Sequence, residues 1–411
     1  MIRRKNLQRT DRQPRHDFNG DIVSRAIQHF FASCPRGLEA VLSAELESLD
    51  AQAITPTQGG VGFAGSFPLC YRVNLESRIA SRVLWRVGQG RYRHEEDLYQ
   101  AARDLPWPVW FSPHRTIKVK VSAQQCPLRS LDFVTLRIND AVCDRFSAAT
   151  GTRPSVDTRR PDIRIALFLD QTRFTLYVDT SGEALFKRGL RKAGGEAPLR
   201  ENLAAGILRL AGFSATQTLL DPMCGSGTML IEAAQIARNI APGLGRSFAF
   251  EKLRNFDPHA WRGLCEAAQS RQTQDAPRAI YGSDRDPTAI LAARANLEAA
   301  GLAAAVRLAQ ADVLDLEPPA EEGIIVTNPP YGVRTGDQAA LAAWYPRLGD
   351  VLKQRFPGWR AYLFTADLRL PKLIGLAASR RTPLFNGPLE CRLCEFKLVR
   401  GAHRRTTSGA L

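Results

Sequence analysis

The sequence lacks the marks of membrane, secreted and metal-dependent proteins. It has no apolar run of about eighteen residues, which excludes a membrane-spanning helix. No apolar stretch follows the basic segment from Met1 to Arg15, so we expect no secretory leader. The eight cysteines are scattered without the spacing of a disulfide framework, and no two of the six histidines stand at metal-ligand spacing. We therefore expect reduced thiols, a cytoplasmic location and no bound metal.

Acidic residues are also in short supply. Lys and Arg number 56 against 41 Asp and Glu, so the formal net charge is +15 at pH 7. Such a surplus favours a polyanionic partner, because each neutralised phosphate releases a counterion. Arginine, with its planar guanidinium, suits contacts with phosphates and bases. On composition alone, simple solubility explains the charge equally well.

The length and the hydrophobic pattern predict two or three domains. Residues 1–26 form a basic tail without periodicity, which we expect to be disordered. The rest of the first half alternates short strands and helices, as small α+β units do. We expect strands at 29–32, 59–63, 116–121, 163–169 and 174–179, and helices at 36–46, 70–87 and 131–146. After a basic, glycine-rich linker at 187–200, strand and helix alternate as in a doubly wound sheet.

The strongest local motif lies at residues 219–234. A strand ends in the acid Asp221, a turn with Gly225 and Gly227 follows, and a helix begins at once. Glycines let the backbone approach a ligand, and the helix N-terminus presents free N–H groups. The acid suits the ammonium of an amino-acid-like ligand, and the N–H groups suit its carboxylate. No Lys follows the second glycine, so this is not a phosphate loop; a tight turn without a ligand is the alternative. The candidate ligand-binding residues are Asp221, Met223, Cys224, Gly225, Ser226, Gly227 and Thr228.

Two further acids follow predicted strands. Asp284 ends the strand at 279–284, where a carboxylate can accept both hydroxyls of a ribose. Its distance along the chain from the glycine turn requires an insertion, which residues 239–262 supply. Asp286 precedes Pro287 and is interpreted as a helix N-cap. Asp312 follows a third strand and would lie beside an adenine amino group, unless it merely caps a turn.

The decisive motif is Asn328-Pro329-Pro330-Tyr331, which follows the apolar strand 324–327 at the edge where α/β sites lie. An exocyclic amine on a base is a poor nucleophile, because its lone pair is delocalised into the ring. Asn328 Oδ1 and the Pro329 carbonyl can accept the two amine hydrogens, and Tyr331 can stack on the base. The neutral amide also avoids trapping a cationic methyl donor. A rigid turn without function is the alternative.

Three other features are weaker signals. Cys391 and Cys394 share one predicted strand and would point to opposite faces, which favours core thiols over zinc ligands. Trp107 and Trp110 stand beside prolines and are more typical of packing anchors than of base-stacking residues. Cys224 is interpreted as a small residue in a tight turn rather than as a nucleophile.

Taken in this order, the motifs resemble those of the amino-methylating branch of the Rossmann-like methyltransferases. Segments 30–39, 58–63, 160–165, 197–205 and 241–244 are similar to the THUMP-containing RNA guanine-N2 methyltransferases, and most to the bacterial form that acts on 23S rRNA. The similarity covers roughly residues 28–399. The basic tail departs from the family pattern. Some relatives continue into a second methyltransferase domain, so we predict only one modification here.

The resemblance implies an α/β protein. A ferredoxin-like unit (27–69) and a THUMP RNA-binding domain (70–181), both α+β, would precede a linker (182–198), a Rossmann-like class I methyltransferase domain (199–400) and a tail (401–411). The resemblance also implies S-adenosyl-L-methionine as cofactor, held by Asp221, Gly225, Gly227, Asp284 and Asp312, with the guanine held by residues 328–331. Asn328 is a candidate for both cofactor and guanine.

The expected function is methylation of guanine N2 in 23S rRNA or a pre-ribosomal particle, by a monomer that binds neither membrane nor metal. A tRNA guanine-N2 methyltransferase is the alternative within the family. A DNA adenine-N6 methyltransferase would share the catalytic turn, and the RNA-type first half argues against it. A non-catalytic RNA-binding assembly factor would have no need of Asp221, Asp284 and Asn328 together.

Overall fold

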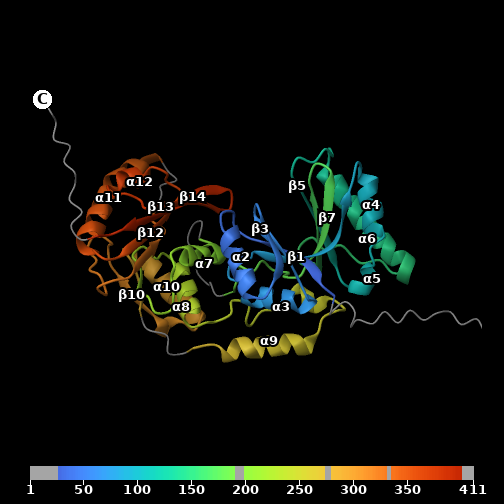
Figure 1. Cartoon of the computed structure of the whole chain (residues 1–411), viewed down its shortest axis with the longest axis horizontal. Helices are drawn as coiled ribbons and strands as arrows, with labels where there is room; N and C mark the ends of the chain where they lie inside the picture. The colour runs from blue at the N-terminus through green and yellow to red at the C-terminus, as the bar shows by residue number, and fades with distance from the viewer. Residues whose placement is uncertain (1–25, 190–198, 274–278, 331–334, 400–411) are drawn as a thin grey trace, which may run out of the picture.

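The computed structural model describes residues 26–189, 199–273, 279–330 and 335–399, without the side chains of 335–338. These residues build two seven-stranded sheets, one in each half of the chain (Figure 1). The predicted catalytic residue Tyr331 lies outside the described residues, as do nearly all of the predicted tails and part of the linker.

The first half alternates strands and helices as the sequence predicts. It consists of β1 (Gln28–Ser33), α2 (Glu39–Ser48), β2 (Gln52–Thr57), β3 (Gly60–Gly65), α3 (Phe67–Glu76), β4 (Arg82–Arg91), α4 (Glu95–Arg103), α5 (Trp107–Trp110), β5 (Ile117–Ala123), α6 (Leu131–Thr150), β6 (Ile163–Leu169) and β7 (Arg173–Asp179). Its longest helix is clearly delimited: Ser130 Oγ accepts from the N–H of Phe133 at the start of α6, and Gly151 ends α6 with a φ of 71°.

One prediction for this half is wrong. Residues 70–87 were expected to form a helix, but α3 ends at Glu76 and residues 82–91 form β4. The side chain of Glu45 accepts from the Ser77 hydroxyl and the Arg78 N–H, which holds the chain in a turn after α3. Beyond it, Val83 and Trp85 are buried while the residues beside them are less so, which is the period-two pattern of a strand.

All seven strands of the first half belong to one sheet, in the order β2-β3-β1-β4-β7-β6-β5. The ring of Phe67 on α3 contacts both Phe30 on β1 and Trp85 on β4, so a single apolar layer lies between the helices and the sheet. Trp107 and Trp110 are buried against this layer as packing anchors. The predicted boundary at 69/70 falls within α3, and its position stays a proposal.

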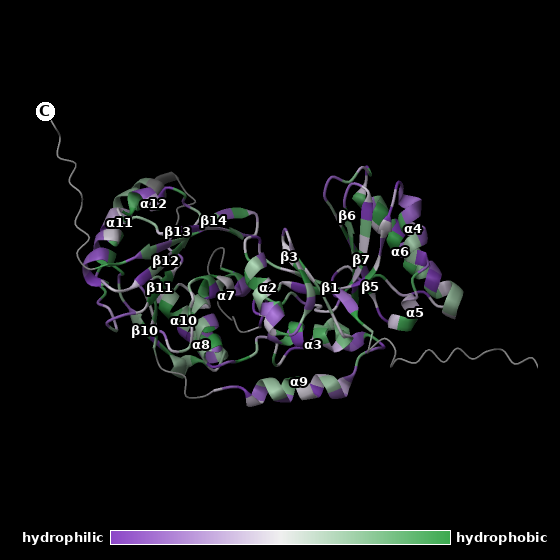
Figure 2. Ribbon diagram, viewed as in Figure 1, coloured by the Kyte–Doolittle hydropathy of each residue, from purple (hydrophilic) through white to green (hydrophobic). Residues whose placement is uncertain are grey.

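The second half contains the predicted doubly wound segment. Its strands are β8 (Leu219–Asp221), β9 (Ile280–Asp284), β10 (Val306–Gln310), β11 (Ile324–Thr327), β12 (Arg360–Thr365), β13 (Arg380–Asn386) and β14 (Leu389–Lys397). Its helices are α7 (Glu201–Leu210), α8 (Thr228–Ala237), α9 (Pro258–Ser270), α10 (Pro287–Ala299), α11 (Thr335–Arg355) and α12 (Leu370–Leu373), with short 3-10 turns at Ala249–Lys252 and Ala303–Ala305. The helices mix hydrophobic and hydrophilic residues (Figure 2), as elements with one buried face do.

The second sheet has the order β10-β9-β8-β11-β12-β14-β13. The first five strands in this order are parallel, and β14 and β13 are antiparallel to their neighbours. The order along the chain reverses between β8 and β11, which is where ligands bind in sheets of this kind. Cys391 and Cys394 are buried in two different apolar clusters, so they are core thiols on opposite faces of β14.

The two halves meet through buried contacts. Leu38 packs so closely on Gly206 of α7 that an added Cβ there would lie 2.3 Å from its side chain. Arg188 forms an ion pair of 2.7 Å with Glu232 of α8, and both side chains are almost fully buried. Arg188 also donates to the carbonyl of Arg78. Because buried groups lock the junction, the first half has a fixed place relative to the second.

No described helix is long and apolar enough to cross a membrane. Within the described ranges, no three His, Cys, Asp or Glu side chains are grouped closely enough to hold a metal ion.

Candidate active site

Four of the predicted site residues lie at the ends of four neighbouring parallel strands. Asp221 ends β8, Asp284 ends β9, Asp312 follows β10 and Asn328 follows β11. These strands are adjacent in the order β10-β9-β8-β11, so the four side chains share the carboxyl edge of the sheet. The structure therefore brings together residues that are up to 107 positions apart in the sequence.

Asp221 is the buried acid of this edge. Its side chain is only 3% exposed and accepts from the Thr327 hydroxyl at 2.7 Å and from the Met223 N–H at 3.3 Å. Burial, with a smaller contribution from the charge of Asp284, raises the pKa of Asp221 to about 7. A cation placed beside this carboxyl would favour its ionised form.

The glycine turn connects Asp221 to α8. Gly225, with a φ of 52°, donates its N–H to Asp284 Oδ2 at 2.9 Å, and nothing lies within 4 Å of an added Cβ there. Gly227 adopts a φ of 82° directly before α8, and glycine offers no side chain to cap the first N–H groups of the helix. Asn296 of α10 donates to the Ser226 carbonyl at 3.0 Å. The turn is thus fixed in shape but open beside Gly225.

Asp284 is held between two backbone donors. One of its oxygens accepts from Gly225, and the other accepts from the N–H of Asp286 at 3.0 Å. Each oxygen keeps a second lone pair for a hydroxyl donor. Asp286 itself caps α10 by accepting from the N–H of Thr288, which confirms the interpretation of Asp286 as an N-cap. Residues 239–262, the predicted insertion, lie between α8 and β9 and include the start of α9.

Asp312 and Cys224 both form hydrogen bonds that stabilise the local backbone. Asp312 accepts from the N–H of Leu314 at 2.9 Å, so it does cap a turn; its contact with an adenine stays a proposal. Cys224 is 7% exposed, and its N–H donates to the carbonyl of Ser283. Burial and the nearby Asp221 raise the pKa of the Cys224 thiol well above its ordinary value, which disfavours a nucleophilic role.

The Asn-Pro-Pro turn leaves β11 at the same edge. Asn328 Oδ1 is buried and has no hydrogen-bond partner in the described ranges, although a buried acceptor normally has one. Pro329 is buried and Pro330 is exposed. Tyr345 of α11, fully buried, donates its hydroxyl to the Pro330 carbonyl at 3.2 Å. Tyr345 therefore fixes the backbone of the turn at Pro330, while Asn328 Oδ1 is free to accept a hydrogen bond from a ligand.

The chemistry of this edge fits S-adenosylmethionine. The ligand's ammonium group needs a carboxylate, which Asp221 supplies, and its carboxylate needs N–H groups such as those at the start of α8. Its ribose needs an acceptor for two hydroxyls, which Asp284 supplies. Open space beside Gly225 leaves room next to that acceptor.

The pattern of the sequence does not reveal two residues that support this site. Thr327 links the ends of β8 and β11 through Asp221. Tyr345 fixes the Pro330 carbonyl, and burial together with the nearby Asp367 raises the pKa of Tyr345 to about 12, so its hydroxyl keeps its proton. Thr327 is the last residue of β11, directly before the decisive motif, and nothing local marks it as a partner of Asp221. Tyr345 reads as an ordinary core residue of a helix.

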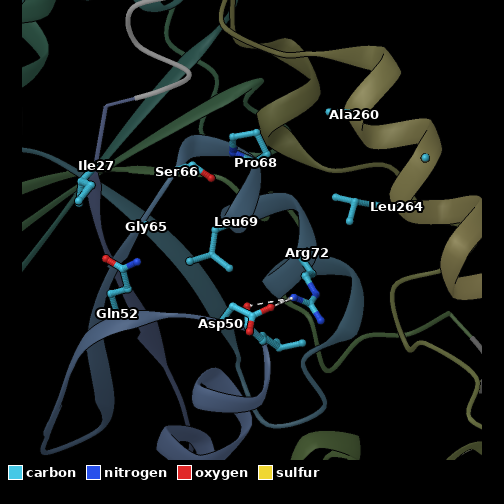
Figure 3. A pocket seen from close by; sticks show the side chains of 12 residues that line it. Ile27, Asp50, Gln52, Gly65, Ser66, Pro68, Leu69, Arg72, Ala260 and Leu264 are labelled. Atoms are coloured by element: carbon cyan, nitrogen blue, oxygen red, sulfur yellow. Dashed lines mark hydrogen bonds and ion pairs between the residues drawn. The ribbon is translucent and has the colours of Figure 1, made fainter.

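A separate hollow of about 660 Å³ lies on the first half, beside α3 and α9 (Figure 3). Arg72, which lines it, pairs with Asp50 at 2.6 Å and with Glu76. None of its lining residues belongs to the carboxyl edge of the second sheet. This hollow is therefore not part of the candidate site.

The Tyr345 hydroxyl gives a first prediction. Tyr345→Phe keeps the buried ring and removes the hydroxyl, which donates to the Pro330 carbonyl and also contacts Thr365 and Asp367. We expect kcat to fall about ten-fold, because small displacements of a reacting group are costly. Cofactor affinity and the melting temperature should stay close to those of the parent. Tyr362→Phe removes a hydroxyl that contacts Glu395 at the other side of the sheet and serves as the control. Parental kcat for Tyr345→Phe would show that this hydroxyl does not position the turn.

Family models match three consecutive parts of the chain. The model described as the RlmL ferredoxin-like domain matches residues 29–84, the THUMP domain model matches 92–179, and the RMKL-like methyltransferase domain model matches 188–395. The match to the methyltransferase model confirms the Rossmann-like fold predicted for the second half.

Whole-chain relatives agree with these matches. A Synechocystis protein named as a candidate RNA methyltransferase is 39% identical over 378 residues, which are 91% of this chain and 98% of that protein. A protein of Allochromatium vinosum named ribosomal RNA large subunit methyltransferase K/L is 41% identical over 378 residues; the match covers 90% of this chain but only 51% of that protein. This chain thus spans about half the length of the K/L relatives. A solved structure of SMU.472, titled a candidate methyltransferase complexed with SAH, has a TM-score of 0.84 and 29% identity over 91% of this chain and 99% of that one.

Three findings lead to one assignment. The methyltransferase model matches half of the chain, one relative is matched over nearly its whole length, and the site at the strand ends suits the cofactor. The chain belongs to the RMKL-like family of S-adenosylmethionine-dependent methyltransferases, with a ferredoxin-like and a THUMP domain ahead of its catalytic domain.

Proposed function

We propose that this protein transfers a methyl group from S-adenosylmethionine to N2 of a guanine in large-subunit ribosomal RNA. The observation that carries the proposal is the buried Oδ1 of Asn328 after β11, which has no hydrogen-bond partner within the described part of the chain. An acceptor in this position needs a donor from a ligand, and an exocyclic amino group supplies N–H donors. The acids that suit the methyl donor lie at the carboxyl ends of β8, β9 and β10, which are the three strands on one side of β11.

Each polar group of the cofactor has a proposed partner in the chain. Asp221 faces its ammonium, the first N–H groups of α8 face its carboxylate, Asp284 accepts from its ribose hydroxyls, and Asp312 lies toward its adenine. The residues between Met223 and Thr228 form the wall along which it lies. When bound, the cofactor supplies an electrophilic methyl group on a sulfonium.

The residues of the turn act on the base. Asn328 Oδ1 and the Pro329 carbonyl accept the two N2 hydrogens and so concentrate the lone pair on nitrogen. Tyr345 keeps the turn in place by binding the Pro330 carbonyl. The methylated nitrogen is acidic and releases its extra proton to water, so no strong base is required. Holding the amine in line with the methyl group supplies most of the rate gain.

The RNA substrate is proposed from three observations. The THUMP model matches the first half, the net charge is +15, and curated relatives carry ribosomal RNA large subunit methyltransferase in their names. The family resemblance favours guanine N2 as the target. A base within a helix would have to leave the stack to reach the turn.

The raised pKa of Asp221 predicts a pH-dependent cofactor affinity. Below a pH of about 7 the buried carboxyl of the free protein keeps its proton, and this neutral form attracts the ammonium poorly. Affinity for S-adenosylmethionine should therefore rise as the pH passes through about 7 and level off above it. Calorimetry across this range measures the change. Asp221→Asn should bind more weakly, without this dependence on pH; an unchanged pH profile in the variant would remove Asp221 from the ammonium site.

The substrate class is tested by offering alternatives side by side. The purified protein is incubated with labelled S-adenosylmethionine and, separately, with unmodified 23S rRNA, tRNA and DNA. We expect label in the 23S rRNA. Label in tRNA alone or in DNA alone would overturn the proposed substrate, and no transfer to any nucleic acid would favour a non-catalytic binding factor.

A further inference from the structure

The first sheet has one face that the helices do not cover. Phe30 on β1 and Trp85 on β4 are directly opposite in register and both face the helices. Their neighbours Phe31 and Arg86 therefore face the other way, and Tyr177, which pairs with Arg86 across β4 and β7, shares that side. Figure 1 shows α4, α5 and α6 along one side of β5 and β7. We call the side opposite the helices the open face.

Charge separates sharply between the two sides of this sheet. Helices α2, α4 and α6 carry nine acidic residues and three arginines. In the described strands, the only acid on the open face is Asp179, which is buried and paired with Arg82. The basic residues of the open face, besides Arg82, are Arg86, Arg91, Lys118, Lys120, Arg164 and Arg173.

Two like-charged pairs stand directly opposite each other across strands of the open face. Arg91 pairs with Arg173 in the β4–β7 register, and Lys118 pairs with Arg164 in the β5–β6 register. Like charges placed so destabilise a sheet. Among the described residues, none of these four side chains forms an ion pair with a carboxylate. Lys118 donates to the Thr158 carbonyl at 2.8 Å, and Arg164 donates to the Gly182 carbonyl. A phosphate placed between the members of such a pair would offset their repulsion.

Three aromatic side chains and a glycine lie on the open face; Phe31 and Tyr177 are half-buried, and Phe168 is exposed. The rings of Phe31 and Tyr177 contact each other with their centroids 6.2 Å apart, and Phe168 on β6 is 38% exposed. Gly62 is directly opposite Phe31, and an added Cβ there would meet nothing closer than 3.7 Å. The packing of the chain itself therefore does not demand this glycine. A glycine within a strand marks a bulge or a close approach by a ligand. The β2–β3 register shifts next to Thr55, the partner of Gly62, so the bulge is the alternative reason for this glycine.

We propose that the open face binds a single-stranded segment of the RNA substrate. Bases stack on Phe31, Tyr177 and Phe168, and phosphates lie between the like-charged pairs. From β3 to β5 the face extends about 24 Å, at about 4.8 Å per strand, which is enough for several nucleotides. Because the proposed contacts are stacking and charge, with none to the base edges, we expect the open face to bind RNA with little preference for its sequence. The inference rests on the proposed function for the identity of the RNA.

The charge contribution is tested in the full chain with a fluorescent single-stranded oligouridine of about 12 nucleotides. Lys120 is exposed on the open face, and Arg103 is exposed on the helix side of the same half. Lys120→Glu should weaken binding roughly ten-fold and lower the salt dependence of log K by about 0.7 or more. Arg103→Glu makes the same charge change and should bind as the parent does. Equal losses in the two variants would mean that only the overall charge matters, which overturns the proposal.

The stacking surface is tested by two further variants. Tyr177→Leu should weaken binding of the oligouridine roughly ten-fold. Gly62→Val places a branched side chain on the flat surface and should weaken binding, while the melting temperature stays the same or rises because Val favours strands. A merely structural role for Gly62 predicts the reverse pattern. Parental affinity in both variants, or equal losses for a duplex of the same length, would overturn the single-stranded proposal.

These outcomes are separable from the proposed function. Methyl transfer to 23S rRNA by the parent protein, together with unchanged binding in all variants, would reject the open face and keep the enzyme. Loss of oligouridine binding in the variants, without methyl transfer by the parent, would keep the open face and reject the proposed reaction.

Discussion

Asn328→Ala should lower kcat for RNA methylation by a factor on the order of 10²–10³, by analogy with the loss of a positioned group in an oxyanion hole. The Oδ1 atom that this change removes is buried and has no hydrogen-bond partner among the residues that the structure describes. In the proposed mechanism its partner is the amine that reacts, so the loss should fall on kcat rather than on cofactor affinity. Single-turnover transfer of labelled methyl groups measures the effect.

Two controls separate chemistry from folding. Calorimetry with S-adenosylmethionine should give nearly parental affinity for Asn328→Ala, because the proposed cofactor residues end other strands. The melting temperature should stay the same or rise, because Oδ1 accepts no hydrogen bond from the residues that the structure describes. A folded, cofactor-binding variant that methylates RNA at the parental rate would remove Asn328 from the mechanism.

Glu232→Gln should lower the free energy of unfolding by about 3–5 kcal/mol, the typical effect of breaking a buried ion pair. Arg188 would then be left in the junction without its countercharge, since both side chains are almost fully buried. Arg78, which is also buried there, would lose the same negative charge; burial already lowers its pKa to about 10. Urea denaturation measures the change.

A surface pair provides the matched control. Glu183 and Lys187 form an ion pair of 3.0 Å, and both side chains are more than half exposed. Glu183→Gln should therefore cost at most about 0.5 kcal/mol. If Glu232→Gln and Glu183→Gln unfold at the same urea concentration, the buried pair does not hold the two halves together.

The residues that meet at the carboxyl edge of the second sheet could be predicted, because each belongs to a short motif of consecutive residues. A strand that ends in Asp, a glycine turn and a helix start occupy consecutive residues around Asp221, and the Asn-Pro-Pro turn is equally compact. Parallel strands place their carboxyl ends together, so local motifs were enough to gather Asp221, Asp284 and Asn328. Whether these residues bind the cofactor and the guanine as proposed stays a prediction.

The support of the site could not be predicted, because it depends on pairing between distant segments. The bond from Thr327 to Asp221 spans 106 residues, and that from Arg188 to Glu232 crosses the junction of the halves. Neither pair leaves a local pattern. The wrong helix at 70–87 has a similar cause: Glu45, far back in the sequence, holds the turn that ends α3.

The one continuous sheet in the first half is also a tertiary property. The sequence predicts separate α+β units, and each strand in them is recognisable. That β4 pairs with both β1 and β7, and so joins the units, depends on contacts with residues on either side in space. The open face exists only because of this pairing.

The central claim is that guanine N2 in large-subunit ribosomal RNA receives the methyl group. Identification of the labelled nucleoside tests it most directly: 23S rRNA methylated by the purified protein is digested to nucleosides and separated by chromatography with mass detection. The account predicts label in N2-methylguanosine, absent with Asn328→Ala. Label in N6-methyladenosine, or in a guanosine methylated at any other atom, would contradict it.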